Sequence, residues 1–406
     1  MWYNIYGVKK RDRAAKNVRG TNFMPLVVPQ EVIIKKYALS EAGKHIGRYG
    51  KNCLIIAGGH FYASEDWDFL KATLSLRGIA FDAEEYIGGE PVVDYVDGLA
   101  AEYKSKRGAP LVDCVIGIGG GSVLDAAKAV SGMLTNGGGV ESYIDAKGKT
   151  VMTNAPLPFI AVPTTAGTGA EATKNAVLKH VGKKYKRSFR DERLMAKCVI
   201  IDASLYAGTP KEVTAYSGMD SLAQLIEAFT SKRATKETEE FCRQGLRHIQ
   251  YLAAAYSEGD NILAREETAL AAYKSGVAIS NGGVGAVHAL ASPIGAHTGL
   301  PHGLICGILL PHVMEVNKEH ALPKYAEIGR ILTGDNGDDR HMADSAVAAV
   351  RSLAETLKIP ATFRNERLVG LAPQIVGECI DGGSMRSNPH DFDAGFWAKF
   401  MTGVCI

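Results

Sequence analysis

Two pairs of polar residues in the apolar second half of the chain have the types and spacing of a metal site. Asp220 and Gln224 are four residues apart on a predicted helix, so both lie on one face of it. His288 and His302 follow in two of the least polar segments. Two histidines and a buried carboxylate form a known ligand set for divalent metals, although a lone buried histidine is more often an ordinary core residue. The spacing alone leaves both interpretations open.

A run of three glycines indicates a second site, one for an anion. Gly119, Gly120 and Gly121 follow an apolar run, and Ser122 opens a helical pattern. Without Cβ atoms the backbone amides approach a phosphate closely, and the positive end of a helix attracts it. The loop matches neither GxGxxG nor the GK[ST] of nucleotide hydrolases. The three glycines at the start of a helix nevertheless predict a phosphate-binding turn. A strand-to-helix turn without a ligand is the alternative.

A threonine-rich loop at residues 163–171 is the third candidate. Thr164, Thr165 and Thr168 follow the next apolar run. Their hydroxyls and small neighbours suit a polar ligand that crosses the carboxyl ends of parallel strands. A plain threonine-rich turn is the alternative, and the nearby glycine loop favours the ligand.

The first half of the chain contains the elements that would position these loops. Short apolar runs alternate with helical patterns, which predicts a parallel sheet with crossover helices. The predicted strands are 52–57, 79–86, 112–118, 158–163 and 197–202, and the predicted helices are 64–77, 91–107 and 122–133.

From about residue 211 onward the periodicity is mostly helical. The predicted helices are 211–231, 237–256, 263–280, 284–297, 303–317, 341–357 and 367–379. The Ala-Gly-Thr-Pro at residues 207–210 interrupts the pattern before them. We therefore predict an α/β nucleotide-type domain over residues 23–207, an all-helical domain over 208–406 and an N-terminal extension over 1–22.

Composition and charge exclude several classes of protein. The chain has 406 residues, and its 46 Lys+Arg against 44 Asp+Glu give a net charge of +2, which argues against a nucleic-acid binder. It has no stretch of about 18 apolar residues that would span a membrane. The seven cysteines are dispersed and lack CxxC, so we expect free thiols in a reducing cytoplasm, without a disulfide framework or a cysteine zinc site.

Several motifs in order resemble the iron-containing (group III) alcohol dehydrogenase family over roughly residues 23–395. They are GIGGGSVLDAAK at 117–128, PTTAGTGAE at 163–171, GMDSLAQLIEA at 218–228, VHALASPIGAHTGLPHG at 287–303, ILLPHVMEVN at 308–317 and Ser-Asn-Pro at 387–389. The resemblance implies a dehydroquinate synthase-like fold, with an α/β N-terminal dinucleotide-binding domain on a parallel sheet and an all-α C-terminal metal-binding domain. A cleft between them would hold NAD(P)(H) and a divalent metal, Fe²⁺ or alternatively Zn²⁺.

The resemblance also implies which residues bind the cofactor. The glycine loop with Ser122 would hold the pyrophosphate, the threonines would lie along the cofactor, and Lys186 would reach its ribose. The implied cofactor-binding residues are Gly58, Gly59, Gly119, Gly120, Gly121, Ser122, Asp125, Thr164, Thr165, Thr168, Thr173 and Lys186.

The implied metal ligands match the family at three positions out of four, namely Asp220, His288 and His302. At the fourth, the usual histidine is replaced by Gln224, as in a branch of the family that carries glutamine there. An amide oxygen is a weaker donor than imidazole toward iron or zinc. A further histidine common in the family is Ser292 here, which leaves His297 as the candidate for a proton relay.

The end of the first predicted strand bears on the choice of cofactor. Family members strict for NAD often carry an aspartate there, which binds the adenosine ribose, and this chain has Gly58 and Gly59. Without that carboxylate, no evident charge opposes a 2′-phosphate. We therefore expect NADP(H) to be slightly favoured, or both cofactors to be used.

The reaction implied by the resemblance is reversible hydride transfer between nicotinamide and an alcohol or aldehyde carbon, with the metal as Lewis acid. Residues 293–300 are apolar with one histidine and no basic cluster, which favours a small neutral substrate. The resemblance also implies a homodimer. Two alternatives stay open: a non-redox lyase similar to dehydroquinate synthase, and a nucleotide-binding protein that has lost its metal.

Overall fold

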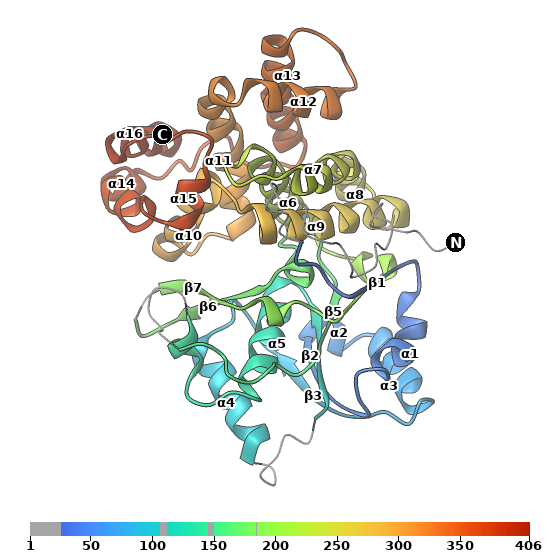
Figure 1. Ribbon diagram of the computed structural model, residues 1–406. Helices are drawn as coiled ribbons and strands as arrows, with labels where there is room; N and C mark the ends of the chain where they lie inside the picture. The colour runs from blue at the N-terminus through green and yellow to red at the C-terminus, as the bar shows by residue number, and fades with distance from the viewer. Residues whose placement is uncertain (1–25, 106–111, 145–149, 184) are drawn as a thin grey trace, which may run out of the picture.

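The computed structural model describes residues 26–105, 112–144, 150–183 and 185–406. A sheet-containing N-terminal part lies against a helical C-terminal part (Figure 1). Six parallel strands form the sheet in the order β1-β8-β5-β4-β2-β3. The predicted fold class, a parallel α/β part followed by an all-helical part, is therefore confirmed. The predicted extension, residues 1–22, lies outside the described residues.

The central strands of the sheet are buried on both faces. The strands are β1 (Glu31–Ile34), β2 (Asn52–Gly58), β3 (Ala80–Tyr86), β4 (Cys114–Gly119), β5 (Phe159–Pro163) and β8 (Cys198–Ile201). Every residue of β4, β5 and β8 is buried, which explains why their sequences are continuous apolar runs without alternation. The five predicted strands match β2, β3, β4, β5 and β8, with end shifts of at most two residues.

Helices cover both faces of this sheet. They are α1 (Ala42–Ile46), α2 (Gly59–Tyr62), α3 (Glu65–Ser75), α4 (Val93–Ser105) and α5 (Gly121–Met133). The helices α1 and α3 pack on one face, and α4 and α5 pack on the other (Figure 1). From β2 the chain moves to β3 at one edge, then returns to β4 and continues toward the other edge. Ligands of open α/β sheets bind at such a switch point, which here lies between the ends of β2 and β4.

The C-terminal part consists of helices packed around α6. They are α6 (Lys211–Thr230), α7 (Lys236–His248), α8 (Leu252–Ser257), α9 (Ile262–Gly282), α10 (Ala286–Thr298), α11 (His302–Asn317), α12 (Leu322–Thr333), α13 (Asp339–Thr356), α14 (Glu366–Cys379), α15 (Gly383–Ser387) and α16 (Ala394–Cys405). Most of α6 is buried, and it contacts α7, α9 and α11. None of the described helices has both the length and the apolar character that crossing a membrane requires.

Several elements differ from the sequence predictions. An antiparallel hairpin, β6 (Asn175–His180) with β7 (Tyr185–Arg190), was not expected, because its strands are charged and half-exposed and so form no apolar run. The strand β1, which is only four residues long, was also not predicted. The predicted helix 237–256 is divided into α7 and α8 by a turn of 3₁₀ helix. The helices α12 and α16 were not predicted either.

The threonine-rich loop after β5 joins the two parts of the chain. The Ser221 hydroxyl of α6 donates a hydrogen bond to the Gly167 carbonyl at 2.8 Å. Gly169 has a φ of 61°, and a Cβ on it would lie 2.5 Å from the Cα of Gly276 in α9. Only glycine accommodates both this conformation and this contact. The loop is therefore held directly against α6 and α9.

Lys128 of α5 holds the same loop from the sheet side. Its side chain is fully buried. The ammonium donates to the Ala170 carbonyl at 2.7 Å, the Thr173 hydroxyl at 2.9 Å and the Asn175 carbonyl at 2.8 Å. These three hydrogen bonds and the Asp125 carboxylate, whose Oδ1 lies 3.5 Å from the ammonium, offset the cost of burying the charge. One side chain thus fixes the path of the chain from the loop into β6.

Replacing Lys128 with Met should destabilise the protein, because the methionine fills similar space but leaves the buried carbonyls without a donor. We expect a loss of about 3 kcal/mol in the free energy of unfolding, measured by urea unfolding followed by circular dichroism. Lys179→Met on the exposed side of β6 is the control, with an expected change within about 0.5 kcal/mol. Equal unfolding midpoints for the two variants would contradict the role given to Lys128.

Candidate active site

Four side chains from three helices of the C-terminal part converge. Asp220 belongs to α6, His288 to α10, and His302 and Cys306 to α11. Nε2 of His288 lies 3.2 Å from Oδ1 of Asp220, and Nε2 of His302 lies 3.6 Å from the same oxygen. Sγ of Cys306 lies 3.6 Å from Nε2 of His302. These four residues are called the ligand cluster below.

The geometry of the ligand cluster fits a metal ion. One ligand atom from each residue lies within 4.8 Å of every other. Metal–ligand bonds of about 2.0–2.3 Å place neighbouring ligand atoms about 3–4 Å apart, and the three distances given above, 3.2–3.6 Å, fall in this range. Imidazole and carboxylate donors with a thiol suit iron or zinc. The structure thus brings together three of the four predicted ligands and adds a cysteine.

Glu227 orients His288 from behind the ligand cluster. It lies on α6, and its Oε2 is 2.6 Å from Nδ1 of His288. Its Oε1 accepts a hydrogen bond from the backbone amide of Val287, also at 2.6 Å. A carboxylate on one ring nitrogen keeps a proton there and turns the other nitrogen toward a metal. Nε2 of His288 accordingly faces Asp220.

Burial and charge set the protonation of the ligand cluster. Asp220 is only 2% exposed. Burial alone would raise the pKa of Asp220, but the hydrogen bond from His288 and the nearby His302 outweigh it and hold the pKa below its usual value. Burial lowers the pKa of His302 to about 4. A carboxylate and a neutral imidazole are the forms that bind metals, so Asp220 and His302 are in their binding forms at neutral pH. Burial would lower the pKa of His288, but the hydrogen bonds to Asp220 and Glu227 outweigh it and raise the pKa to about 10, so His288 must release a proton when a metal binds.

Gln224, the fourth predicted ligand, lies beside Asp220 but has other partners. Its Nε2 donates to Oδ2 of Asp220 at 3.0 Å. Its Oε1 accepts a hydrogen bond from the Ser275 hydroxyl of α9 at 2.7 Å. An amide nitrogen has no lone pair to offer a metal. The side chain of Gln224 is therefore near the ligand cluster, and its only donor oxygen is bound to Ser275.

The predicted phosphate loop has no room for side chains. A Cβ on Gly120 would lie 3.1 Å from Oγ1 of Thr165, and one on Gly121 would lie 2.4 Å from Oγ1 of Thr168. The glycine and threonine loops thus lie against each other at the carboxyl ends of β4 and β5. Gly120, Gly121 and the neighbouring Ser122 are partly exposed. Their amides and hydroxyls are the groups that bind a pyrophosphate, so the residues present fit a dinucleotide.

Other residues predicted to bind the cofactor take part in contacts within the protein. The Thr164 amide donates to the Gly119 carbonyl at 3.0 Å. Asp125 accepts a hydrogen bond from the Val177 amide at 2.9 Å. The Thr173 hydroxyl accepts from Lys128, as described above. Lys186 on β7 forms an ion pair with Glu90. The direct contact of these residues with a cofactor stays a prediction.

A carboxylate lies beside the glycine pair at the end of β2. Gly58 ends β2 and Gly59 begins α2. A Cβ on Gly59 would lie 2.7 Å from Oε1 of Glu85, a residue of β3. This carboxylate comes from the neighbouring strand, so the sequence around Gly58 and Gly59 gives no sign of it.

The structure does not bring His297, the predicted proton relay, into the ligand cluster. Its Nε2 lies 3.0 Å from Oε1 of Glu378 on α14. It lines a separate pocket together with Leu300 and Leu368. This location gives no support to a relay at the metal.

Cys306 and Glu227 were not predicted as residues of the metal site, although each shares a helix face with a predicted ligand. Cys306 follows His302 by four residues and Glu227 follows Asp220 by seven, so each pair shares a helix face. Cys306 resembled a core residue because its neighbours are apolar. Glu227 has no distinguishing neighbour, and only its contact with His288 reveals its role.

A glycine-rich turn at the switch point of a parallel sheet and a buried Asp/His cluster in an adjoining helical part define a metal- and dinucleotide-dependent enzyme. The family described as iron-containing alcohol dehydrogenase matches residues 29–203. The C-terminal family of Fe-containing alcohol dehydrogenases matches residues 214–370.

Individual relatives agree with these matches. Probable alcohol dehydrogenase EutG of Escherichia coli is 34% identical over 328 residues, 80% of each chain. NAD-dependent methanol dehydrogenase of Bacillus methanolicus is 31% identical over 335 residues, 82% of this chain and 85% of that one. The crystal structure of a 1,3-propanediol oxidoreductase has a TM-score of 0.87 and 28% identity, covering 94% of this chain and all of that one.

The chain belongs to the iron-containing alcohol dehydrogenase family. It is a metal-binding, NAD-linked alcohol dehydrogenase, an oxidoreductase that acts on CH–OH groups. The family resemblance and the class of activity expected from the sequence motifs are confirmed at this level. This membership decides for a dehydrogenase over the lyase.

Replacing Glu227 with Gln should weaken metal binding about 10–100-fold, because the neutral amide no longer anchors the Nδ1 proton of His288. The dissociation constant for Zn²⁺ is measured by competition with a chromophoric chelator. Glu237→Gln in the exposed first turn of α7 is the control and should bind as the unchanged protein does. Equal affinity in both variants would show that Glu227 does not support the site.

Proposed function

We propose that the chain transfers hydride reversibly between a nicotinamide cofactor and a small neutral alcohol or aldehyde, at a metal held by Asp220, His288 and His302. The observation that carries the proposal is the convergence of these side chains around one buried carboxylate. When bound, the metal supplies Lewis-acid polarisation of the substrate oxygen, and the nicotinamide gives or takes the hydride.

The residues of the chain bind and orient the reactants. The glycine loop with Ser122 binds the pyrophosphate, and Thr165 and Thr168 lie along the cofactor. Lys186, which forms an ion pair with Glu90 in this structure, would reach a ribose of the cofactor. Asp125, Thr164 and Thr173 shape this binding surface through the hydrogen bonds described above. The fit of the glycine and threonine loops supports these assignments.

The substrate is small and uncharged. Residues 293–300 contain no lysine or arginine, and Pro293 and Ile294 are buried. A dianionic substrate needs basic partners, and the relatives described above are by name a methanol dehydrogenase and a 1,3-propanediol oxidoreductase, so a simple alcohol or aldehyde is the proposed substrate. The metal is Fe²⁺, as the family description indicates, with Zn²⁺ as the alternative for the same donors.

We also propose that the protein is a homodimer in the cytoplasm. The family resemblance supports the dimer. All seven cysteines are free and buried, which is compatible with a reducing compartment.

We propose that the enzyme uses both NADH and NADPH and slightly favours NADPH. The absence of a carboxylate at Gly58 supports it. Glu85, beside Gly59, is the group that would oppose a 2′-phosphate, and it would make the preference for NADPH small.

Aldehyde reduction should require metal. The protein is stripped by a chelator, reloaded anaerobically with Fe²⁺ or Zn²⁺, and assayed through oxidation of NADH and NADPH with a series of small aldehydes. We expect no turnover without metal and recovery on reloading, with a higher kcat/KM for NADPH. Turnover that persists in the stripped protein would refute the metal-dependent mechanism.

Replacing Glu85 with Gln should raise kcat/KM for NADPH relative to NADH by about tenfold, because one charge that repels the 2′-phosphate is lost. The ratio is measured with a single aldehyde on the reloaded enzyme. Glu102→Gln at the exposed end of α4 is the control and should leave the ratio unchanged. If Glu85→Gln also leaves it unchanged, Glu85 does not face the ribose.

A further inference from the structure

The position of Cys306 is not explained by packing alone. It lies one helical turn after His302 on α11, so both side chains point to the same side of the helix. Its Sγ is 3.6 Å from Nε2 of His302. It is also within 4.8 Å of ligand atoms of Asp220 and His288. The sulfur thus completes a group of four potential ligands from three helices.

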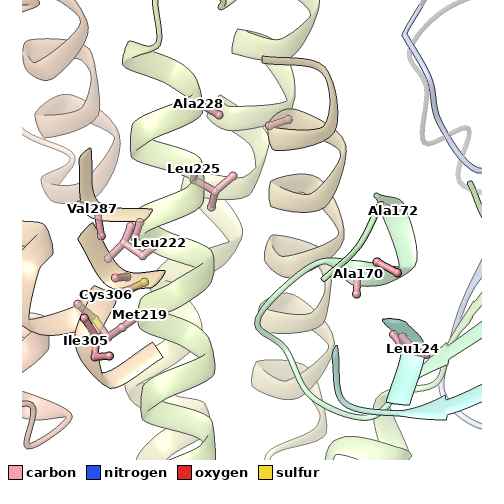
Figure 2. Packing of buried hydrophobic residues seen from close by; sticks show 14 of the residues in the cluster. Leu124, Ala170, Ala172, Met219, Leu222, Leu225, Ala228, Val287, Ile305 and Cys306 are labelled. Atoms are coloured by element: carbon pink, nitrogen blue, oxygen red, sulfur yellow. The ribbon is translucent and has the colours of Figure 1, made fainter. Parts of the chain in front are cut away.

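Cys306 is also part of the apolar core. It is fully buried and belongs to the same apolar cluster as Met219, Ile305 and Val287, which Figure 2 shows around α6. A buried cysteine often serves only as a small apolar side chain. Here, however, one side of the sulfur faces a carboxylate and two imidazoles. An apolar role does not require that contact, whereas a metal ligand does.

Gln224, the other candidate for the fourth ligand position, is committed elsewhere. Its amide nitrogen faces Asp220 and its carbonyl oxygen is bound to Ser275. In this arrangement Gln224 holds Oδ2 of Asp220 through a hydrogen bond and leaves Oδ1 of Asp220 for the metal. Ligation by Gln224 would require the amide to turn over and give up the hydrogen bond from Ser275.

We propose that the thiolate of Cys306 is the fourth protein ligand of the metal, and that Gln224 is a positioning residue that holds Asp220. The proposal rests on the proposed function in that a divalent metal occupies the ligand cluster. On binding, the S–H bond is replaced by a sulfur–metal bond and the proton passes to the solvent. No atom changes its oxidation state in this step.

A thiolate in this position changes the charge of the site. Asp220 and Cys306 together carry two negative charges and neutralise a divalent ion, whereas Asp220 with Gln224 would leave one positive charge. The thiolate is also a softer donor, which favours zinc and cobalt over magnesium or manganese.

Cobalt substitution gives a direct test, because a Co²⁺–thiolate bond produces a near-ultraviolet charge-transfer band that oxygen and nitrogen ligands do not. We expect the band in the Co²⁺-loaded full-length protein and in Gln224→Leu and Cys379→Ser. We expect Cys306→Ser to bind Co²⁺ about 10–100-fold more weakly, without the band. Cys379 is a matched control because it is a buried cysteine on α14, outside the ligand cluster.

X-ray absorption of the unchanged protein loaded with one equivalent of Zn²⁺ gives a second measurement that needs no variant to fold. We expect one sulfur neighbour at about 2.3 Å. Bound Zn²⁺ and Co²⁺ with no sulfur signature would overturn the Cys306 proposal and leave the proposed function intact. If neither metal binds the unchanged protein, the metal site of the proposed function fails as well.

Discussion

The buried carboxylate of Asp220 is the constraint on which the arrangement of the helical part depends. A charge that is almost completely removed from water must be compensated by nearby donors or cations. Its direct partners are His288 on α10, His302 on α11 and Gln224 on α6 itself, and the amide of Gln224 is in turn held by Ser275 on α9. The packing of α6 against α9, α10 and α11 therefore has a polar centre that fixes their mutual positions more closely than apolar contact alone.

A second polar centre, Lys128, does the same for the loop between the two parts. It binds the loop to α5, while Gly167 and Gly169 bind it to α6 and α9. The glycine loop at the start of α5 therefore has a defined position relative to α6, which carries Asp220. In this way the surface proposed for the dinucleotide and the ligand cluster are held in a fixed relation by elements that are distant in the sequence.

The sequence was most informative where one motif determines one local structure. Apolar runs followed by glycine predicted the central strands, because strands buried on both faces must be apolar. Polar residue types in apolar segments drew attention to Asp220, His288 and His302, the family resemblance predicted them as ligands, and the structure brings them together. The hairpin β6–β7 was missed because its strands are charged and partly exposed. Glu85 and Cys306 were missed because their roles depend on neighbours in space, which a pattern along one segment does not contain.

The contact between Gly169 and Gly276 has a mechanical consequence. The two parts of the chain meet there through backbone atoms alone, since a Cβ on either residue would overlap the other. Side chains can change rotamer and so allow two surfaces to slide, but a backbone-to-backbone contact offers no such adjustment. An opening between the parts would therefore turn about this point more readily than slide along it. The loop proposed to lie along the cofactor would then also be the pivot between the two parts.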